Sequence, residues 1–172
     1  MADMDELQKA LNVSAGVLAG AEREEALASL QAQIRAWDIA LPRVEPLLWH
    51  FGLHDFPKTG LTEYWIANEL EAGYCAKYLF LFDGQSCPMH LHQVKVETFF
   101  IVKGRARMLC SGVAREMGPG ETLLVHAGTS HSFTGLGPVL LLEVSMPSRV
   151  DDNFFEDTRV PYGGNYRKGA SR

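Results

Sequence analysis

Three side chains that commonly bind metal ions stand within one stretch of eight residues, HLHQVKVE: His90, His92 and Glu97. Two imidazoles and one carboxylate suit borderline divalent metals, with bonds of about 2.0–2.2 Å for zinc-like ions. Alternate residues of a strand face the same side, so His90 and His92 share a side that Glu97 does not. We therefore expect a turn or bulge between His92 and Glu97. A third imidazole could come from His131 in GTSHSF, which leads into another strand.

The segments around these residues predict a domain built mainly from β-strands. From about residue 60, short runs rich in aromatic and aliphatic residues are separated by Gly and Pro: TEYWIAN, AKYLFLF, VETFFIV, ARMLC, ETLLVHA and VLLLEVSM. Several short strands at regular spacing are typical of an all-β sandwich or small barrel. If Glu97 points into a barrel, Lys95 and Phe99 should point inward, and Thr98 and Phe100 outward.

The chain before residue 60 has a helical pattern instead. Apolar residues at steps of three and four predict a helix from Glu22 to about Ala40, with a shorter helix before it over residues 5–11. We expect residues 1–60 to form a helical extension, 61–150 the barrel, and 151–172 a tail that is loosely held from residue 161. His50 and His54, spaced i, i+4, could share a helix face but have no nearby third ligand.

Composition and charge exclude several classes of protein. The chain has 172 residues, of which 47% are hydrophobic and 22% charged, with a net charge of −5, so no basic surface for nucleic acid is expected. No apolar run approaches the ~20 residues that span a bilayer, and the acidic N-terminus does not resemble a secretory signal. The three cysteines are odd in number and lack CxxC spacing, which favours reduced thiols in the cytoplasm.

At these residues the sequence resembles the cupin superfamily. The first cupin motif is reproduced at every spacing by Gly84, His90, His92, Glu97 and Gly104. The second motif is resembled by Gly120, His126-Ala127-Gly128 and His131, with His126 where proline is usual and Gly135 where asparagine is usual. The resemblance implies an all-β cupin fold, a small double-stranded β-helix or jelly-roll barrel. It also implies a divalent ion held by His90, His92, Glu97 and His131.

A narrower resemblance is to the D-lyxose isomerase group of sugar-isomerase cupins. It rests on YCAKYLFLFDGQSCPMHLH, on KVETF and on HSFTGLGPVLLLEVSMPSRVDDNFFED. The last of these stretches also resembles cupin modules attached to sialic-acid synthases, and fuller members of the isomerase group have a longer segment between the metal motifs. The resemblance implies a manganese enzyme that interconverts an aldose and its ketose. The sequence leaves Fe²⁺, Zn²⁺, Ni²⁺ and Co²⁺ open as the metal.

In such a reaction the ion would bind O1 and O2 of an open-chain sugar and polarise the carbonyl. Glu143 is the candidate base for the C2 proton, because burial among the aliphatic residues of VLLLEVSM would raise its pKa. Lys95 is the candidate for stabilising the developing oxyanion. Substrate contacts are expected from Lys77, Phe99 and Phe133. The alternatives are a structural ion pair of Glu143 with Lys77 or Lys95, and core packing for the two phenylalanines.

Other functions remain open on the same fold. The chain could be a non-catalytic sugar- or metabolite-binding cupin, which would not need a proton-transfer group beside the metal. It could also be an iron-dependent dioxygenase or a metal-dependent lyase. By analogy with small cupins we expect a homodimer, with the helical N-terminus near the interface. The expected partner is a small sugar.

Overall fold

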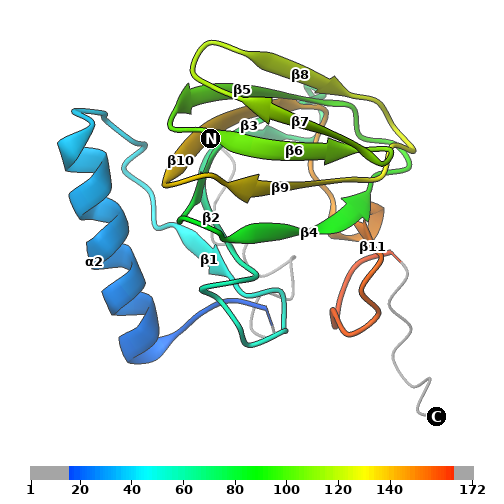
Figure 1. Ribbon diagram of the computed structural model, residues 1–172. Helices are drawn as coiled ribbons and strands as arrows, with labels where there is room; N and C mark the ends of the chain where they lie inside the picture. The colour runs from blue at the N-terminus through cyan, green and yellow to red at the C-terminus, as the bar shows by residue number, and fades with distance from the viewer. Residues whose placement is uncertain (1–15, 165–172) are drawn as a thin grey trace.

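The computed structural model describes residues 16–164. These residues form two antiparallel β-sheets that face each other and close into a small barrel, which confirms the all-β prediction (Figure 1). The helix predicted over residues 5–11 lies outside the described residues. No helix in the described part of the chain is long and apolar enough to cross a membrane.

The larger sheet has six strands in the order β1-β2-β3-β10-β5-β8. Their bounds are Leu47–Trp49 (β1), Leu61–Glu69 (β2), Tyr74–Leu81 (β3), Val139–Ser145 (β10), Glu97–Lys103 (β5) and Thr122–Val125 (β8). All six strands predicted from the sequence exist, and five of them lie in this sheet. Their inward residues, with those of the second sheet, form a core that includes Leu79, Phe99, Met108, Phe133 and Leu141.

The second sheet has five strands in the order β11-β4-β9-β6-β7. Their bounds are Phe154–Phe155 (β11), Ser86–Leu91 (β4), His131–Gly135 (β9), Ala106–Cys110 (β6) and Val113–Met117 (β7). Consecutive strands β4 and β5 belong to different sheets, so the chain crosses from one sheet to the other over residues 92–96. This crossing is the turn that the spacing of His92 and Glu97 requires.

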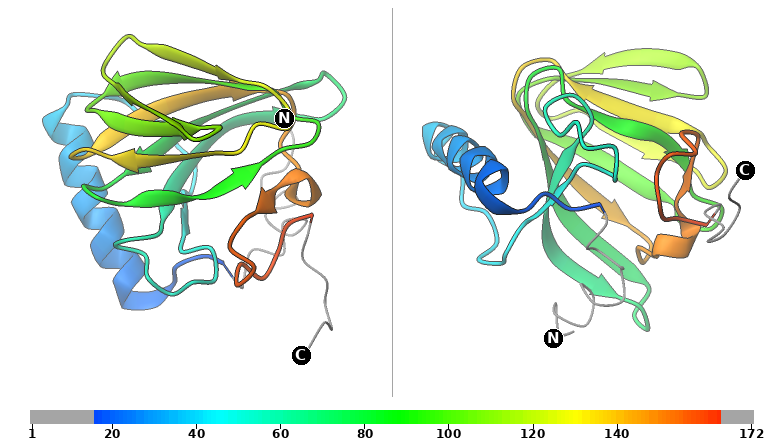
Figure 2. Two further views of the ribbon diagram at one scale, coloured as in Figure 1. Left: turned by 45° about the vertical axis from the view of Figure 1, so that its right-hand side comes forward. Right: turned by 90° about the horizontal axis from the view of Figure 1, so that it is seen from below.

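Helix α2 (Gly20–Ala36) lies on the outer face of the six-stranded sheet (Figure 2). Its buried residues Leu30 and Ile34 pack with Tyr64, Phe80 and Leu140 in a second apolar cluster. The helix ends about four residues before the predicted end, because Asp38 adopts a left-handed φ of 54° and the Ile39 N–H turns back to the Ile34 carbonyl at 3.3 Å.

Two expectations about the flanking segments are wrong. His50 and His54 follow β1 in turns rather than sharing a helix, since both Phe51 and His54 have positive φ. The tail is not loosely held at its start, because the Tyr162 ring lies 5.5 Å from Trp49 and 5.6 Å from Phe155. The division at residues 60 and 150 stays a prediction. Both flanking segments contribute a strand to the sheets, β1 and β11.

Candidate metal centre

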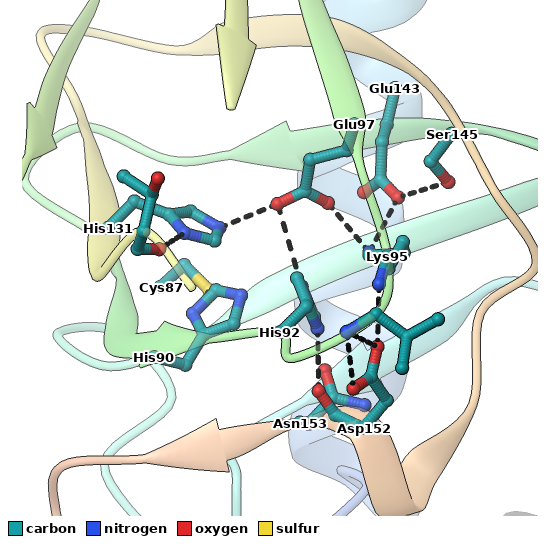
Figure 3. A network of polar contacts seen from close by, with 12 residues as sticks. Cys87, His90, His92, Lys95, Glu97, His131, Glu143, Ser145, Asp152 and Asn153 are labelled. Atoms are coloured by element: carbon teal, nitrogen blue, oxygen red, sulfur yellow. Dashed lines mark hydrogen bonds and ion pairs between the residues drawn. The ribbon is translucent and has the colours of Figure 1, made fainter. Parts of the chain in front are cut away.

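The four predicted ligands lie together at one end of the barrel interior (Figure 3). His90 is near the end of β4, Glu97 is the first residue of β5, and His131 is the first residue of β9, opposite His90 in the sheet. His92 stands in the crossing between the two sheets. All four are buried, and one ligand atom from each lies within 4.8 Å of the others, close to the roughly 4 Å that two bonds across one ion would span.

Backbone carbonyls fix the orientation of the three imidazoles. The Nδ1 atoms of His90, His92 and His131 lie 2.8, 2.9 and 2.9 Å from the carbonyl oxygens of Pro88, Asp152 and Thr129. A carbonyl oxygen only accepts hydrogen bonds, so each Nδ1 carries a proton. In the neutral ring the lone pair is then on Nε2, which is the arrangement that metal-binding histidines adopt.

Three of the inward-facing ligand atoms are buried and have no hydrogen-bond partner in the described part of the chain: His92 Nε2, Glu97 Oε1 and His131 Nε2. His131 Nε2 lies 2.7 Å from Glu97 Oε1, and His92 Nε2 lies 3.5 Å from the same oxygen. When the rings are neutral, the Nε2 atoms of both histidines are hydrogen-bond acceptors that face another acceptor, Glu97 Oε1. Such an arrangement is costly in a buried site. A divalent cation among them would satisfy all three atoms, so the residues fit a bound ion.

Electrostatics keep these groups in the protonation states that a metal requires. Burial, with the neighbouring imidazoles, holds the pKa of His90 well below its usual range, and burial and then Lys95 lower the pKa of His92 to about 4. Burial would raise the pKa of Glu97, but the ammonium of Lys95, 2.6 Å away, and His131 outweigh it and hold that pKa well below its usual range. His90 and His92 are therefore neutral, and Glu97 is ionised, near neutral pH.

A row of buried charges leads away from Glu97 across the inner face of the six-stranded sheet. Lys95 Nζ lies 2.6 Å from Glu97 and 3.0 Å from Glu143, and Lys77 Nζ lies 3.4 Å from Glu143 and 2.7 Å from Glu63. The register places Glu143 opposite Lys77 on β3, and Lys95, from the crossing between the sheets, supplies the cation between Glu143 on β10 and Glu97 on β5. The structural ion pair that the sequence left open for Glu143 therefore exists, with both lysines.

The predicted raised pKa of Glu143 is wrong. Burial does act to raise it, but the coulombic effects of Lys77 and Lys95 together outweigh burial, and the pKa is lowered from its usual value. The same pairs raise the pKa of both lysines against the opposing effect of burial. Glu143 is thus an ionised carboxylate inside the barrel.

Glu63 is a buried interior residue that sequence reasoning missed. Its carboxylate pairs with Lys77 and accepts a hydrogen bond from Trp49 Nε1 at 2.9 Å. An isolated acidic residue between the aliphatic and aromatic residues of LTEYW is the signal that could have identified it. A second missed residue is Asp152, whose carbonyl oxygen accepts a hydrogen bond from His92 and whose carboxylate accepts hydrogen bonds from the backbone amides of residues 93–95.

The interior cavity beside the ligands is small, about 50 Å³. Its lining includes His90, His92, Glu97, Glu143 and Lys77. The predicted substrate contacts Phe99 and Phe133 also line it, although both are almost fully buried and belong to the core.

A neighbouring hollow of about 60 Å³ shares Phe51, Glu63, Lys77, Asn153 and Phe155 with this cavity. A larger outer groove of about 550 Å³ is lined by Lys95 and Asp152 but by none of the four ligands. Three of the four metal ligands, His90, His92 and Glu97, therefore line the small inner cavity rather than this larger groove.

The fold and this site together define a cupin with a group of residues that could hold a metal ion. Residues 81–145 match the Cupin domain family. A D-lyxose/D-mannose isomerase of Thermosediminibacter oceani is 30% identical over an alignment of 138 residues, and the match covers 64% of this chain and 75% of that protein. A D-lyxose ketol-isomerase of Cohnella laeviribosi is 33% identical over an alignment of 116 residues, and the match covers 51% of this chain and 63% of that protein.

The L-ribose isomerase of Cellulomonas parahominis, solved with L-ribose, has the same fold. Its TM-score is 0.68 at 15% identity, with 85% of this chain and 96% of that chain covered. The chain belongs to the cupin superfamily and, within it, to the family of the D-lyxose isomerase-like cupins.

Proposed function

We propose that this protein is a divalent-metal-dependent aldose–ketose isomerase of the D-lyxose isomerase type. The observation that carries the proposal is a second ionised carboxylate, Glu143, which lines the same cavity as three of the four metal ligands without being one of them. A binding module needs only the ligand set, whereas an isomerase also needs a group that moves a proton. The names of the relatives point to the same reaction.

A bound divalent ion would supply Lewis acidity at the sugar carbonyl. Glu143 takes the proton from C2, and the electrons of the C2–H bond form the C1–C2 double bond while O1 gains a proton. Glu143 then returns a proton to C1 as O2 loses its proton and becomes the ketone oxygen. Lys95 Nζ, between Glu143 and Glu97, donates to the sugar oxygen that carries the transient negative charge.

The charges of the interior favour a free sugar over a sugar phosphate. Three carboxylates, Glu63, Glu97 and Glu143, line the inner cavity with only two lysines. In the described part of the chain no arginine lines this cavity or the adjoining hollow, and Arg149 lines the outer groove. The interior formed by the described residues thus offers a phosphate group no guanidinium that could bind it through two hydrogen bonds, whereas the hydroxyl groups of a free sugar can bond to both the carboxylates and the ammonium groups.

Three finer features belong to the same proposal. Manganese is favoured by the resemblance to the isomerase family, and the three-imidazole, one-carboxylate donor set also accepts Fe²⁺, Co²⁺, Ni²⁺ or Zn²⁺. We propose a cytoplasmic homodimer that pairs through the outer face of the six-stranded sheet. There Val144, Thr98 and Leu124 stand opposite one another on adjacent strands, and Val144 and Leu124 are exposed.

The test is solvent deuterium exchange in metal-loaded protein given D-lyxose, D-mannose or L-ribose. We expect ketose formation with deuterium at C1, and at least about a 10²-fold lower rate in Glu143→Gln, because a general base contributes about 10²–10⁴-fold. The matched control Glu116→Gln changes an exposed carboxylate on β7 and should leave the rate unchanged. Sugar binding without turnover or exchange would refute the isomerase and indicate a binding module, the role favoured by the ion pairs of Glu143 with both lysines. Oxygen consumption with iron would indicate a dioxygenase instead.

A further inference from the structure

The chain after β10 passes over the open end of the barrel beside the metal ligands. We call residues 148–155 the strap; it contains the short 3-10 helix Val150–Asp152 and strand β11, which pairs with β4 so that Phe155 stands opposite His90. Its start is fixed by two hydrogen bonds between Asn68 and the backbone of Ser148, at 2.9 and 3.1 Å. Asn153 lines both the inner cavity and the adjoining hollow.

Asp152 is the point where the strap contacts the crossing between the two sheets. Its carboxylate accepts hydrogen bonds from three consecutive backbone amides, those of Gln93, Val94 and Lys95, at 2.9, 3.0 and 2.9 Å. Its own carbonyl oxygen accepts the Nδ1 proton of His92 at 2.9 Å (Figure 3). Asp152 is itself buried, with 8% of its surface exposed.

These contacts act on both ends of the crossing. The bond to His92 Nδ1 selects the tautomer whose Nε2 lone pair faces the other ligands. The three amide bonds hold the backbone of Lys95, whose ammonium lies between Glu97 and Glu143. Strands β4 and β5 lie in different sheets, so no backbone hydrogen bonds between these two strands hold residues 93–95. The Asp152 carboxylate instead accepts from the three backbone N–H groups of these residues, which strand pairing would otherwise satisfy.

We propose that Asp152 is a positioning residue that holds His92 and the Lys95 segment in the geometry that binds the metal. The inference rests on the metal site of the proposed function but not on the reaction that the site performs. The residue acts through the groups it orients and is not itself a ligand, since its carboxylate is occupied by the three amides.

The experiment compares Asp152→Asn with the parent protein and with Asp151→Asn. Asp151 is the adjacent, exposed residue of the same 3-10 helix, so it controls for loss of one charge at this place in the chain. Each protein is stripped with a chelator and titrated with Mn²⁺, and free Mn²⁺ is measured by its paramagnetic resonance signal. We expect about 10–100-fold weaker Mn²⁺ binding in Asp152→Asn and no change in Asp151→Asn.

A second measurement separates positioning from chemistry. Amide hydrogen exchange in the metal-free proteins should be at least about tenfold faster at residues 93–95 in Asp152→Asn, since hydrogen bonds to a charged acceptor are lost, while β3 and β10 keep their protection. If Asp152→Asn fails to fold, Asp152→Glu keeps the charge but displaces it by one methylene group, and its Mn²⁺ affinity decides the matter by the same criterion.

Folded Asp152 variants that bind Mn²⁺ as tightly as the parent would overturn the inference. So would a parent protein that binds no divalent ion, which would overturn the proposed function as well. A parent that binds Mn²⁺ but isomerises no sugar would refute the reaction alone and leave the role of Asp152 to be judged by affinity and exchange.

Discussion

Single side chains decide the charge of the barrel interior. Glu63, Lys77, Glu143, Lys95 and Glu97 alternate in sign, three carboxylates against two ammonium groups, which gives −1 for the row and +1 with a divalent ion added. Each member is buried, so each depends on its neighbours for compensation. Removal of one partner from such a row leaves an uncompensated charge, which costs far more than the pair itself contributes.

Replacement of Lys77 by methionine should lower the free energy of unfolding by about 3–5 kcal/mol, because Glu63 and Glu143 both lose their shared cation. The double variant Glu63→Gln/Lys77→Met should be more stable than Lys77→Met alone. Urea unfolding of the parent, both single variants and the double variant measures this coupling. Additive effects would contradict a linked row.

The neutral buried histidines predict a pH dependence for the metal-free protein. The folded pKa of His92, about 4, lies below the unfolded value of about 6.5, so the unfolded chain binds more protons between these values. The stabilisation is therefore complete above pH 6.5 and is lost as the pH falls toward 4, by up to about 3 kcal/mol. Melting curves from pH 7.5 to 5 test this. His92→Gln should flatten the profile, and the exposed control His126→Gln should not.

The sequence predicted the four ligands because their spacing is local, with three of them in one stretch. It did not predict Glu63 with Trp49, or Asp152 with His92, because these partners are 14 and 60 residues apart and meet only through the fold. The sign of the Glu143 pKa shift was wrong for the same reason. Burial could be inferred from VLLLEVSM, but the two lysines beside Glu143 come from β3 and from the crossing between the sheets.

Strands that contain a run of aromatic and aliphatic residues were predictable, and several strands without such a run were not. Strand β7 is exposed at four of its five positions, β4 carries Pro88 and His90, and β11 has only two residues. These strands exist because a partner strand supplies their hydrogen bonds. The turns that join strands carry sharper local requirements, and Gly104 between β5 and β6 is the clearest case.

Gly104→Ala should be more destabilising than Gly112→Ala by about 1–3 kcal/mol. Both glycines have a φ of 78°, so a side chain at either adds the cost of the left-handed region. At Gly104 a Cβ atom would also lie 2.1 Å from the Pro138 carbonyl oxygen, whereas at Gly112 nothing lies within 4 Å. Denaturant unfolding of the two variants measures the difference, and equal losses would show that the loop before β10 moves aside.

At the scale of the whole molecule, the six-stranded sheet separates two apolar clusters. The inner cluster fills the barrel around the candidate metal centre, and the outer one lies between this sheet and α2. The helix could be expected from its apolar stripe, but the sequence did not show which end of the sheet it covers. Substitutions in the cluster under α2 should therefore change the free energy of unfolding without changing the geometry of the metal ligands.

Leu30→Ala should cost about 2–5 kcal/mol of unfolding free energy, because Leu30 is fully buried against the outer face of the sheet. Mn²⁺ affinity measured under native conditions should stay within about twofold of the parent value. Leu70→Ala, at a side chain that is 53% exposed, is the control and should change stability by less than about 0.5 kcal/mol. Loss of Mn²⁺ binding in folded Leu30→Ala would show that the two clusters are not independent.

The strap links the entry of a sugar into the inner cavity to the binding of the metal ion. It covers an inner cavity with room for only a few water molecules, so a pentose can reach that cavity only if the strap gives way. The two residue pairs that join β11 to β4 are a short attachment. The same segment supports His92. Under thermodynamic linkage, whatever favours the shut form must tighten the hold on the cation, and the cation must favour the shut form to the same degree. Sugar and cation would then influence each other's binding through the strap as well as through their direct contact.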